Sequence, residues 1–315
     1  MKPLAWRALL GGLLPLLLLA AVLLKRVHGG GPLGAEAMGL WVALGGWVLM
    51  LWWVLDRTAQ LQQPKALRGV APALFGAALI FLWEMLAVGW QVPQVLLPAP
   101  HQVALALATR WAVLWPDFVQ TFIAVVVGWA MGCGLGLATA LLADRFAFLG
   151  RGLLPLAGLA GAVPIVGIAP IMVMWFGFDW HSKAAVAAVV TFFPMLVNTL
   201  AGLAAVDRQQ SDLMRTYAAG HRKTLLKLRL PSALPFVFNA LKINSTLALI
   251  SAIVAEFFGS PIYGLGFRIS AEVARMNVDM VWAAIVLAAL AGSLFYGLVA
   301  LAERSLTFWH PSYRH

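Results

Sequence analysis

The 315 residues are 62% hydrophobic and only 11% charged, which excludes an ordinary soluble domain, because such domains are about half apolar and a quarter charged. The formal net charge of +10 does not call for a nucleic-acid partner, since basic residues collect in the cytoplasmic loops of membrane proteins. Cys133 is the single cysteine, which excludes a disulfide framework and a cysteine-based zinc site. We therefore expect an all-α integral membrane protein.

Long apolar runs predict about eight transmembrane helices. Their expected bounds, each within about four residues, are 8–24, 38–55, 70–90, 117–143, 152–177, 183–206, 233–257 and 279–303. The first run could instead be a signal peptide, but Lys25 and Arg26 follow it without a cleavage site of small residues, which favours a retained helix. The expected organisation is a two-helix extension over residues 1–69 and a main domain over residues 70–309.

The basic residues predict the orientation of these helices. Residues 207–231 contain six lysines and arginines against two aspartates, which indicates a cytoplasmic loop. An even number of helices then places both termini in the cytoplasm, and only Lys25 and Arg26 conflict with this arrangement. On the outer side, prolines interrupt residues 91–100, and residues 101–115 suit a helix lying at the membrane interface.

The sequence contains no motif for chemistry. It has no Gly-x4-Gly-Lys-Ser/Thr phosphate loop, no His-Glu-x2-His pair and no Gly-x-Ser-x-Gly elbow, so we expect no catalytic residue, no bound cofactor and no metal site. Glu84 and Glu256 lie toward the outer ends of their predicted spans. They can form hydrogen bonds at the interface or couple an ion to transport, and both interpretations stay open.

Residues 212–231 have the pattern of a helical hairpin on the cytoplasmic side. Leu213, Met214 and Tyr217 share one helical face, while the basic residues point elsewhere. Pro231 and Pro235 are expected to end the hairpin and to begin the next span. The hairpin could dock a soluble partner or lie on anionic lipid, and the proline-bounded return favours docking.

The same segment resembles the EAA coupling loop of bacterial ABC importer permeases, whose pattern is E-A-A-x3-G-x9-I-x-L-P. Asp212 stands at the glutamate position, Ala218 at the glycine position, and Leu230 with Pro231 at the closing pair. Two other residues replace the alanines, and Gly220 places the expected glycine two positions later.

Residues 78–275 are similar to the nitrate/sulfonate/taurine-type permeases, which are binding-protein-dependent transport inner-membrane components. This resemblance implies a type I (MetI-like) permease core of five to six helices. The motifs that carry it are Trp83-Glu84, Leu97-Pro98-Ala99-Pro100, the stretch 163–170, Trp175-Phe176-Gly177, Pro194, Asn198, Gly202, Ala255-Glu256 and Gly264-Leu265-Gly266.

The resemblance also implies partners and roles. The chain would be no enzyme itself, because ATP and Mg would be used by a separate cytoplasmic ABC ATPase. A periplasmic or lipid-anchored substrate-binding protein would meet the outer side, where residues 258–278 are a plausible contact, and two permease copies would pair in the bacterial inner membrane. The residues expected to couple to the ATPase are Asp212, Leu213, Met214, Arg215, Tyr217, Ala218, Gly220, Arg222, Leu230 and Pro231.

The substrate is less well defined by the sequence. The resemblance implies a small organic solute, either a pyrimidine- or riboflavin-type vitamin precursor or a sulfonate-, nitrate- or taurine-like anion, and the loop motifs lean toward the vitamin precursors. An ion-coupled secondary transporter and a membrane-bound receptor or scaffold are the rival classes. Residues that could line a translocation path, or simply pack helices, are Pro164, Pro170, Asn198, Asn239, Asn244 and Glu256.

Overall fold

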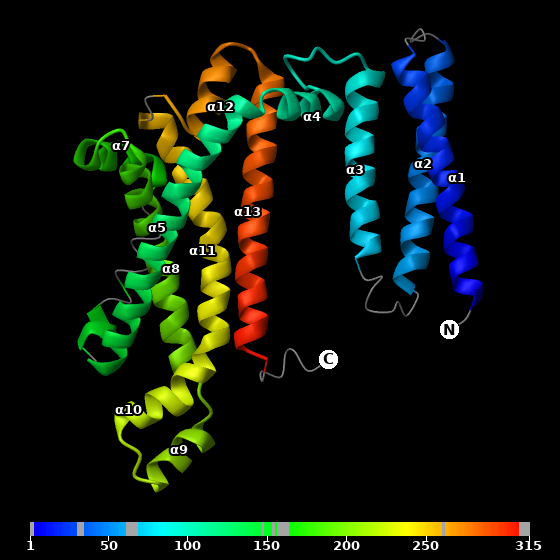
Figure 1. Cartoon of the computed structure of the whole chain (residues 1–315). Coiled ribbons are helices and arrows are strands. Elements are labelled where there is room, and N and C mark those ends of the chain that lie inside the picture. Colours follow the sequence, from blue (N-terminus) through cyan, green and yellow to red (C-terminus); the bar gives the residue numbers. More distant parts are fainter. Residues whose placement is uncertain are drawn as a thin grey trace. The chain divides into compact units, whose positions relative to one another are not determined.

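The computed structural model describes residues 3–29, 35–60, 69–146, 148–152, 155, 164–259 and 262–308. These residues form helices and no strand (Figure 1). The helices are α1 (Pro3–His28), α2 (Ala35–Gln60), α3 (Val70–Gly89), α4 (Pro100–Thr109), α5 (Trp111–Arg145), α7 (Ile165–Phe176), α8 (Trp180–Ala204), α9 (Arg208–Thr216), α10 (His221–Thr224), the π-turn η2 (Leu225–Arg229), α11 (Leu230–Gly259), α12 (Leu265–Ala274) and α13 (Val278–Leu306).

Five described segments are long and apolar enough to cross a bilayer, and they coincide with five of the predicted spans. They are Ala71–Gly89, Trp111–Arg145, Trp180–Ala204, His221–Gly259 and Val278–Leu306. The first two predicted spans are helical, as α1 and α2, but do not belong to these five, so the count of eight is not confirmed. Of the predicted span 152–177, residues 156–163 lie outside the described residues, and α7 has only 12 residues.

The interfacial helix predicted over residues 101–115 ends earlier than expected. α4 ends at Thr109, and Trp111 already begins α5. An aromatic column on one face of α5 explains the difference: the ring centroids of Trp111 and Trp115 lie 5.5 Å apart, and Trp115 lies 5.5 Å from Phe118. Residues three and four positions apart lie on the same helical face. The stacked rings therefore favour extending α5 toward its N-terminus, past Pro116 to Trp111.

Helices α1 to α4 belong to one compact unit, which comprises residues 1–108 and 276–279. α1, α2 and α3 lie side by side around an apolar core that includes Leu23, Leu51 and Met85 (Figure 1). The indole Nε1 of Trp47 donates a hydrogen bond to the carbonyl of Leu16 at 3.1 Å, which joins α2 to α1. The domain boundary expected near residue 70 is not tested by this packing and stays a prediction.

The second unit comprises residues 109–275 and 280–315, and its centre is the packing of α5, α8 and α11. Gly128, Gly132 and Gly136 form a stripe on α5 against α8. A Cβ atom added at these positions would lie 2.5 Å from the Cβ of Ala187, 2.0 Å from the Oγ1 of Thr191 and 2.6 Å from a backbone carbonyl, respectively. Only glycine permits this approach, as in the small-residue interfaces of membrane helices.

Polar contacts also join helices of this unit. The Lys183 ammonium on α8 donates to the carbonyls of Phe178, Asp179 and Gly259, the last of these at the end of α11. Lys242 on α11 pairs with Glu303 on α13 at 2.6 Å. Within this unit, α9 and α10 lie at one end of the long helices, and α7 and α12 lie at the other (Figure 1).

Candidate functional site

The coupling loop expected over residues 207–231 forms a helical hairpin at one end of α8 and α11 (Figure 1). Its first arm is α9, whose N-terminus is capped by Asp207: the carboxylate accepts a hydrogen bond from the backbone N–H of Gln209 at 3.0 Å. Such a cap fixes the start of a short helix by satisfying an otherwise unpaired donor. The second arm is α10 followed by η2.

The turn between the arms depends on Ala218, which has a φ of 49°. The N–H of Ala218 donates to the carbonyl of Arg215, and the N–H of Ala219 donates to the carbonyl of Met214. These two bonds define a Schellman motif, whose left-handed position is usually a glycine. The turn therefore stays at the family's glycine position. Gly220 does not take it over, since its φ of −66° is one that any residue can adopt.

Replacing Ala218 with glycine is expected to make the hairpin more stable, because a left-handed alanine costs about 1–2 kcal/mol. After the larger unfolded-state entropy of glycine is subtracted, we expect a gain of about 1 kcal/mol and about fivefold slower tryptic cleavage within the hairpin. Ala219→Gly is the matched control, and it should speed cleavage. Equal or faster cleavage of the Ala218→Gly variant would show that the turn is not strained.

Part of the apolar surface of the hairpin is left uncovered by the rest of the described chain. The side chains of Leu213, Tyr217 and Leu226 are 56%, 76% and 52% exposed. Asp212 and Arg215 pair with each other at 3.6 Å on the surface, where such a pair contributes little to stability. The hairpin thus presents an apolar ridge with charged neighbours, which is the composition of a docking surface.

The expectation that Pro231 and Pro235 end the hairpin is wrong. A single helical segment runs from His221 to Gly259, with the π-turn η2 just before Pro231. In this turn the N–H of Leu230 donates to the carbonyl of Leu225, five residues back. The wider turn accommodates the proline, which has no N–H to donate and would clash with the carbonyl four residues earlier. Leu230 and Pro231 are therefore the first residues of α11, continuous with the hairpin.

Arg229 anchors the second arm to two other helices. Its guanidinium contacts both carboxylate oxygens of Asp144 on α5, at 3.0 and 2.7 Å, and its Nε donates to the carbonyl of Leu203 on α8 at 3.1 Å. This paired contact is geometrically specific as well as strong. The sequence assigned Arg229 only to a basic face and gave Asp144 no role, because nothing local links residues 85 positions apart.

An open pocket of about 400 Å³ lies between the arms of the hairpin and the end of α8. Met214 and Ala219, which approach each other across the Schellman turn, line it together with Arg215, His221 and Arg229. Since its wall combines apolar and basic side chains, this pocket suits a partner side chain that is partly apolar or acidic. Arg222, also expected in the coupling set, is exposed on α10.

A second polar cluster fastens α12 at the opposite end of this unit. The carboxylate of the buried Glu256 accepts hydrogen bonds from the Oγ1 of Thr121 at 2.7 Å and from the N–H of Gly266 at 2.6 Å. A Cβ atom at Gly264, whose φ is 135°, would lie 2.6 Å from this carboxylate. Glu256 thus holds the start of α12 against α5.

Asp117 completes this cluster, and the sequence gave it no role. One of its oxygens accepts from the N–H of Gly264 at 3.0 Å, and the other accepts from the Nε of Arg268 at 2.6 Å. Burial acts to lower the pKa of Arg268, but its hydrogen bond to Asp117 and the charges of Asp117 and Glu272 raise that pKa above its ordinary value. In the segment expected to meet a binding protein, Arg268 is therefore turned inward, whereas Arg275 is mostly exposed.

The six residues proposed for a translocation path make their contacts separately. Among the described residues, no hydrogen bond joins any two of them. Asn198 donates to the carbonyl of Pro194 within its own helix, and the buried Asn244 donates to the carbonyl of Thr191 and to the Sγ of Cys133. The exposed members are Pro164, Pro170 and Asn239. Their role in a path stays a prediction.

The membrane-length helices and the amphipathic hairpin are those of an all-helical membrane protein. Its residues 130–308, more than half of the chain, match the family described as "Binding-protein-dependent transport system inner membrane component". The chain belongs to this family and is a permease subunit of an ABC transporter. The expected MetI-like fold and inner-membrane location are confirmed, whereas the orientation of the termini stays a prediction.

Full-length relatives support this assignment. The chain is 32% identical over 239 residues to a probable ABC transporter permease protein of Haemophilus influenzae, covering 76% of this chain and 97% of the relative. It is 31% identical over 246 residues to the formylaminopyrimidine transport permease protein ThiX of Halalkalibacterium halodurans, covering 78% and 98%. It is 30% identical over 244 residues to the putative aliphatic sulfonates transport permease protein SsuC of Bacillus subtilis, covering 76% and 87%.

Proposed function

We propose that the hairpin of residues 207–231 is the element through which a cytoplasmic ABC ATPase, which binds ATP and Mg, drives this permease. The observation that carries the proposal is the continuity of the second arm with α11, together with the contacts of Arg229 to α5 and α8. Because these contacts connect the hairpin to three membrane helices, a displacement of the hairpin moves all three. The chain itself contributes force transmission and the path, and performs no chemistry.

The exposed apolar ridge, formed by Leu213 and Tyr217, is the proposed docking surface for the ATPase. Leu213 and Tyr217 would enter an apolar groove of the ATPase, and an acidic side chain of the partner would fit the basic pocket between the arms. One permease copy provides one hairpin, and an ATPase dimer has two equivalent docking grooves. We therefore propose that two copies of the permease pair in the inner membrane, with a periplasmic or lipid-anchored binding protein delivering substrate to the outer side.

For the substrate we propose a small organic solute of the pyrimidine-type vitamin-precursor class. The relative named for formylaminopyrimidine transport is 31% identical and is covered over 98% of its length, and the loop motif Tyr217-Ala218-Ala219 favours the same branch. An aliphatic sulfonate, the solute in the name of another relative, is the competing outcome. Uptake of both solutes by proteoliposomes that contain the complete transporter distinguishes the two.

The docking proposal predicts that the double variant Asp212→Lys with Tyr217→Ala loses its ATPase partner. The variant removes the most exposed apolar side chain of the ridge and reverses a neighbouring charge, so the interface loses both packing and complementarity. The measurement is recovery of a P-loop ATPase with the tagged full-length chain from native membranes in mild detergent.

Lys223→Ala is the control for this pull-down, because it changes an exposed residue of the same hairpin outside the ridge. We expect the wild type and this control to recover the ATPase, and the double variant to recover at least about tenfold less. Failure of the wild type to recover any ATPase, or equal recovery by all three proteins, would contradict the proposed coupling role.

A further inference from the structure

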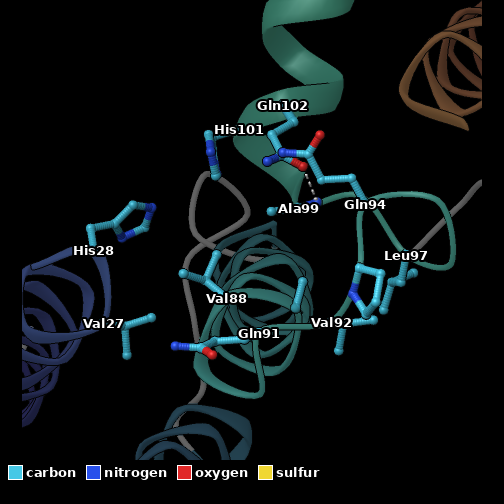
Figure 2. A pocket seen from close by; sticks show the side chains of 12 residues that line it. Val27, His28, Val88, Gln91, Val92, Gln94, Leu97, Ala99, His101 and Gln102 are labelled. Atoms are coloured by element: carbon cyan, nitrogen blue, oxygen red, sulfur yellow. Dashed lines mark hydrogen bonds between the residues drawn. The ribbon is translucent and has the colours of Figure 1, made fainter. Parts of the chain in front are cut away.

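Three residues far apart in the sequence come together in the α1–α4 unit. Nε2 of His28, at the end of α1, lies 3.1 Å from Oε1 of Glu84 on α3, and Nδ1 of His101 on α4 lies 2.6 Å from the same oxygen. The potential ligand atoms of the three residues all lie within 4.8 Å of one another. Figure 2 shows both histidines at one edge of a pocket, and their ring centroids are 5.2 Å apart in an edge-to-face arrangement.

The other ring nitrogen of His28 determines which tautomer this ring adopts. Nδ1 lies 3.0 Å from the carbonyl oxygen of Leu24, and since a carbonyl only accepts, Nδ1 carries the proton. In the neutral ring, Nε2 then directs a lone pair at a carboxylate oxygen, so this contact is favourable only when a proton or a metal ion lies between the two atoms. A histidine that donates one N–H to a backbone carbonyl and directs its other nitrogen at a shared centre has the usual arrangement of a metal ligand.

Glu84 is held in place by a separate contact. Its Oε2 accepts a hydrogen bond from the backbone N–H of His101 at 3.2 Å, at the N-terminus of α4, and only 8% of its side chain is exposed. A carboxylate at a helix N-terminus is favourably placed against the helix dipole. This leaves Oε1 directed toward both imidazole rings, so one preoriented oxygen is shared by two nitrogen ligands.

We propose that His28, Glu84 and His101 bind a divalent transition-metal ion, with Zn²⁺ as the expected occupant. Two imidazoles and one carboxylate are a common zinc donor set, whereas Mg²⁺ and Ca²⁺ prefer oxygen ligands alone. Tetrahedral zinc places its nitrogen and oxygen ligands about 3.3 Å apart. The distance of 3.1 Å between His28 and Glu84 is close to this spacing. The distance of 2.6 Å between His101 and Glu84 is shorter, and a rotation of the half-exposed His101 ring would lengthen it.

The remaining coordination position faces water. The adjoining pocket, of about 440 Å³, is open and is lined by the carboxamides of Gln91, Gln94 and Gln102 beside the two histidines (Figure 2). A water molecule there completes a tetrahedral site with three protein ligands. Since the ligands come from three helices, the ion would fasten α1, which belongs to the N-terminal extension, to α3 and α4. The predicted topology places this site on the outer side of the membrane.

The test uses the full chain in detergent, purified through a tag without histidines and stripped with EDTA. Calorimetric titration with Zn²⁺ should give about one ion per chain, and Co²⁺ should give the visible absorption of a tetrahedral site. His28→Ala, His101→Ala and Glu84→Gln should each weaken Zn²⁺ binding at least about tenfold. Zn²⁺ should also raise the unfolding temperature of the wild type more than that of these variants.

Two further comparisons separate zinc binding at this site from other effects of the substitutions. His181→Ala removes an exposed histidine of α8 and should bind Zn²⁺ as the wild type does. Glu84→Gln keeps an oxygen that can accept from the N–H of His101, so it separates the ligand role from the structural cap. The absence of Zn²⁺ binding by a folded wild-type chain, or unchanged binding in the His28→Ala/His101→Ala double variant, overturns the proposal. Neither outcome depends on transport or on the ATPase partner.

Discussion

Gly132→Ala is expected to destabilise the permease by about 3 kcal/mol, the upper end of what overpacking costs. The added methyl carbon would lie 2.0 Å from the Oγ1 of Thr191 and 2.3 Å from the carbonyl of Ala188. Thr191 cannot easily move aside, because it is buried and donates to the carbonyl of Ala187 at 2.8 Å. α5 must therefore separate from α8 along the glycine stripe. Thermal unfolding in detergent, followed by tryptophan fluorescence, measures the loss.

Gly134→Ala is the matched control, two residues along the same helix. A Cβ atom at this position meets nothing within 4 Å, so the substitution should only add the helix propensity of alanine, about 1 kcal/mol in favour of folding. The two variants are thus expected to shift the unfolding temperature in opposite directions. Shifts of the same sign and size would mean that α5 and α8 do not pack through Gly132.

Arg229→Ala is expected to uncouple ATP hydrolysis from transport while the ATPase still binds. The substitution removes both contacts to Asp144 and the hydrogen bond to Leu203, a loss of about 2 kcal/mol, but leaves the exposed ridge unchanged. Since the hairpin would then move without α5 and α8, substrate uptake per ATP hydrolysed should fall well below the wild-type ratio. Proteoliposomes with ATPase and binding protein, assayed for both activities, give this ratio.

Asp144→Ala should have the same effect as Arg229→Ala, because it breaks the same contact from the other side. Replacing both residues with apolar ones, Asp144→Leu with Arg229→Met, should restore stability without restoring the coupling ratio, since no unpaired charge remains. The exposed Lys223 provides the control substitution to alanine. A coupling ratio that stays at the wild-type value in Arg229→Ala would rule out this anchor as the transmission element.

Much of the membrane topology could be predicted, because the length of an apolar run determines whether a helix can cross. The span predicted at 233–257 is α11, and that predicted at 279–303 is α13, each within a few residues. The resemblance placed Ala218 at the family's glycine position, and the structure gives this residue a left-handed backbone. Gly220, two positions later, does not adopt this conformation, so alanine keeps the left-handed backbone at some cost.

The ion pairs that join different helices could not be predicted in the same way. Asp117 and Arg268 are 151 positions apart, and Asp144 and Arg229 are 85 positions apart, so neither pair leaves a local pattern. The same holds for the histidines that flank Glu84, which the sequence places on separate elements. Periodicity and proline positions report on single helices, whereas these contacts depend on how helices meet.

Lys183 affects how a displacement of the hairpin would be passed through the second unit. Its ammonium group connects the first turn of α8 to the last carbonyl of α11, and Arg229 connects the opposite ends of the same two helices. Two helices that are joined at both ends rotate and tilt together as one rigid body, because the contacts at the two ends resist sliding. A displacement applied at the hairpin therefore reaches the far side without being absorbed by shear between α8 and α11.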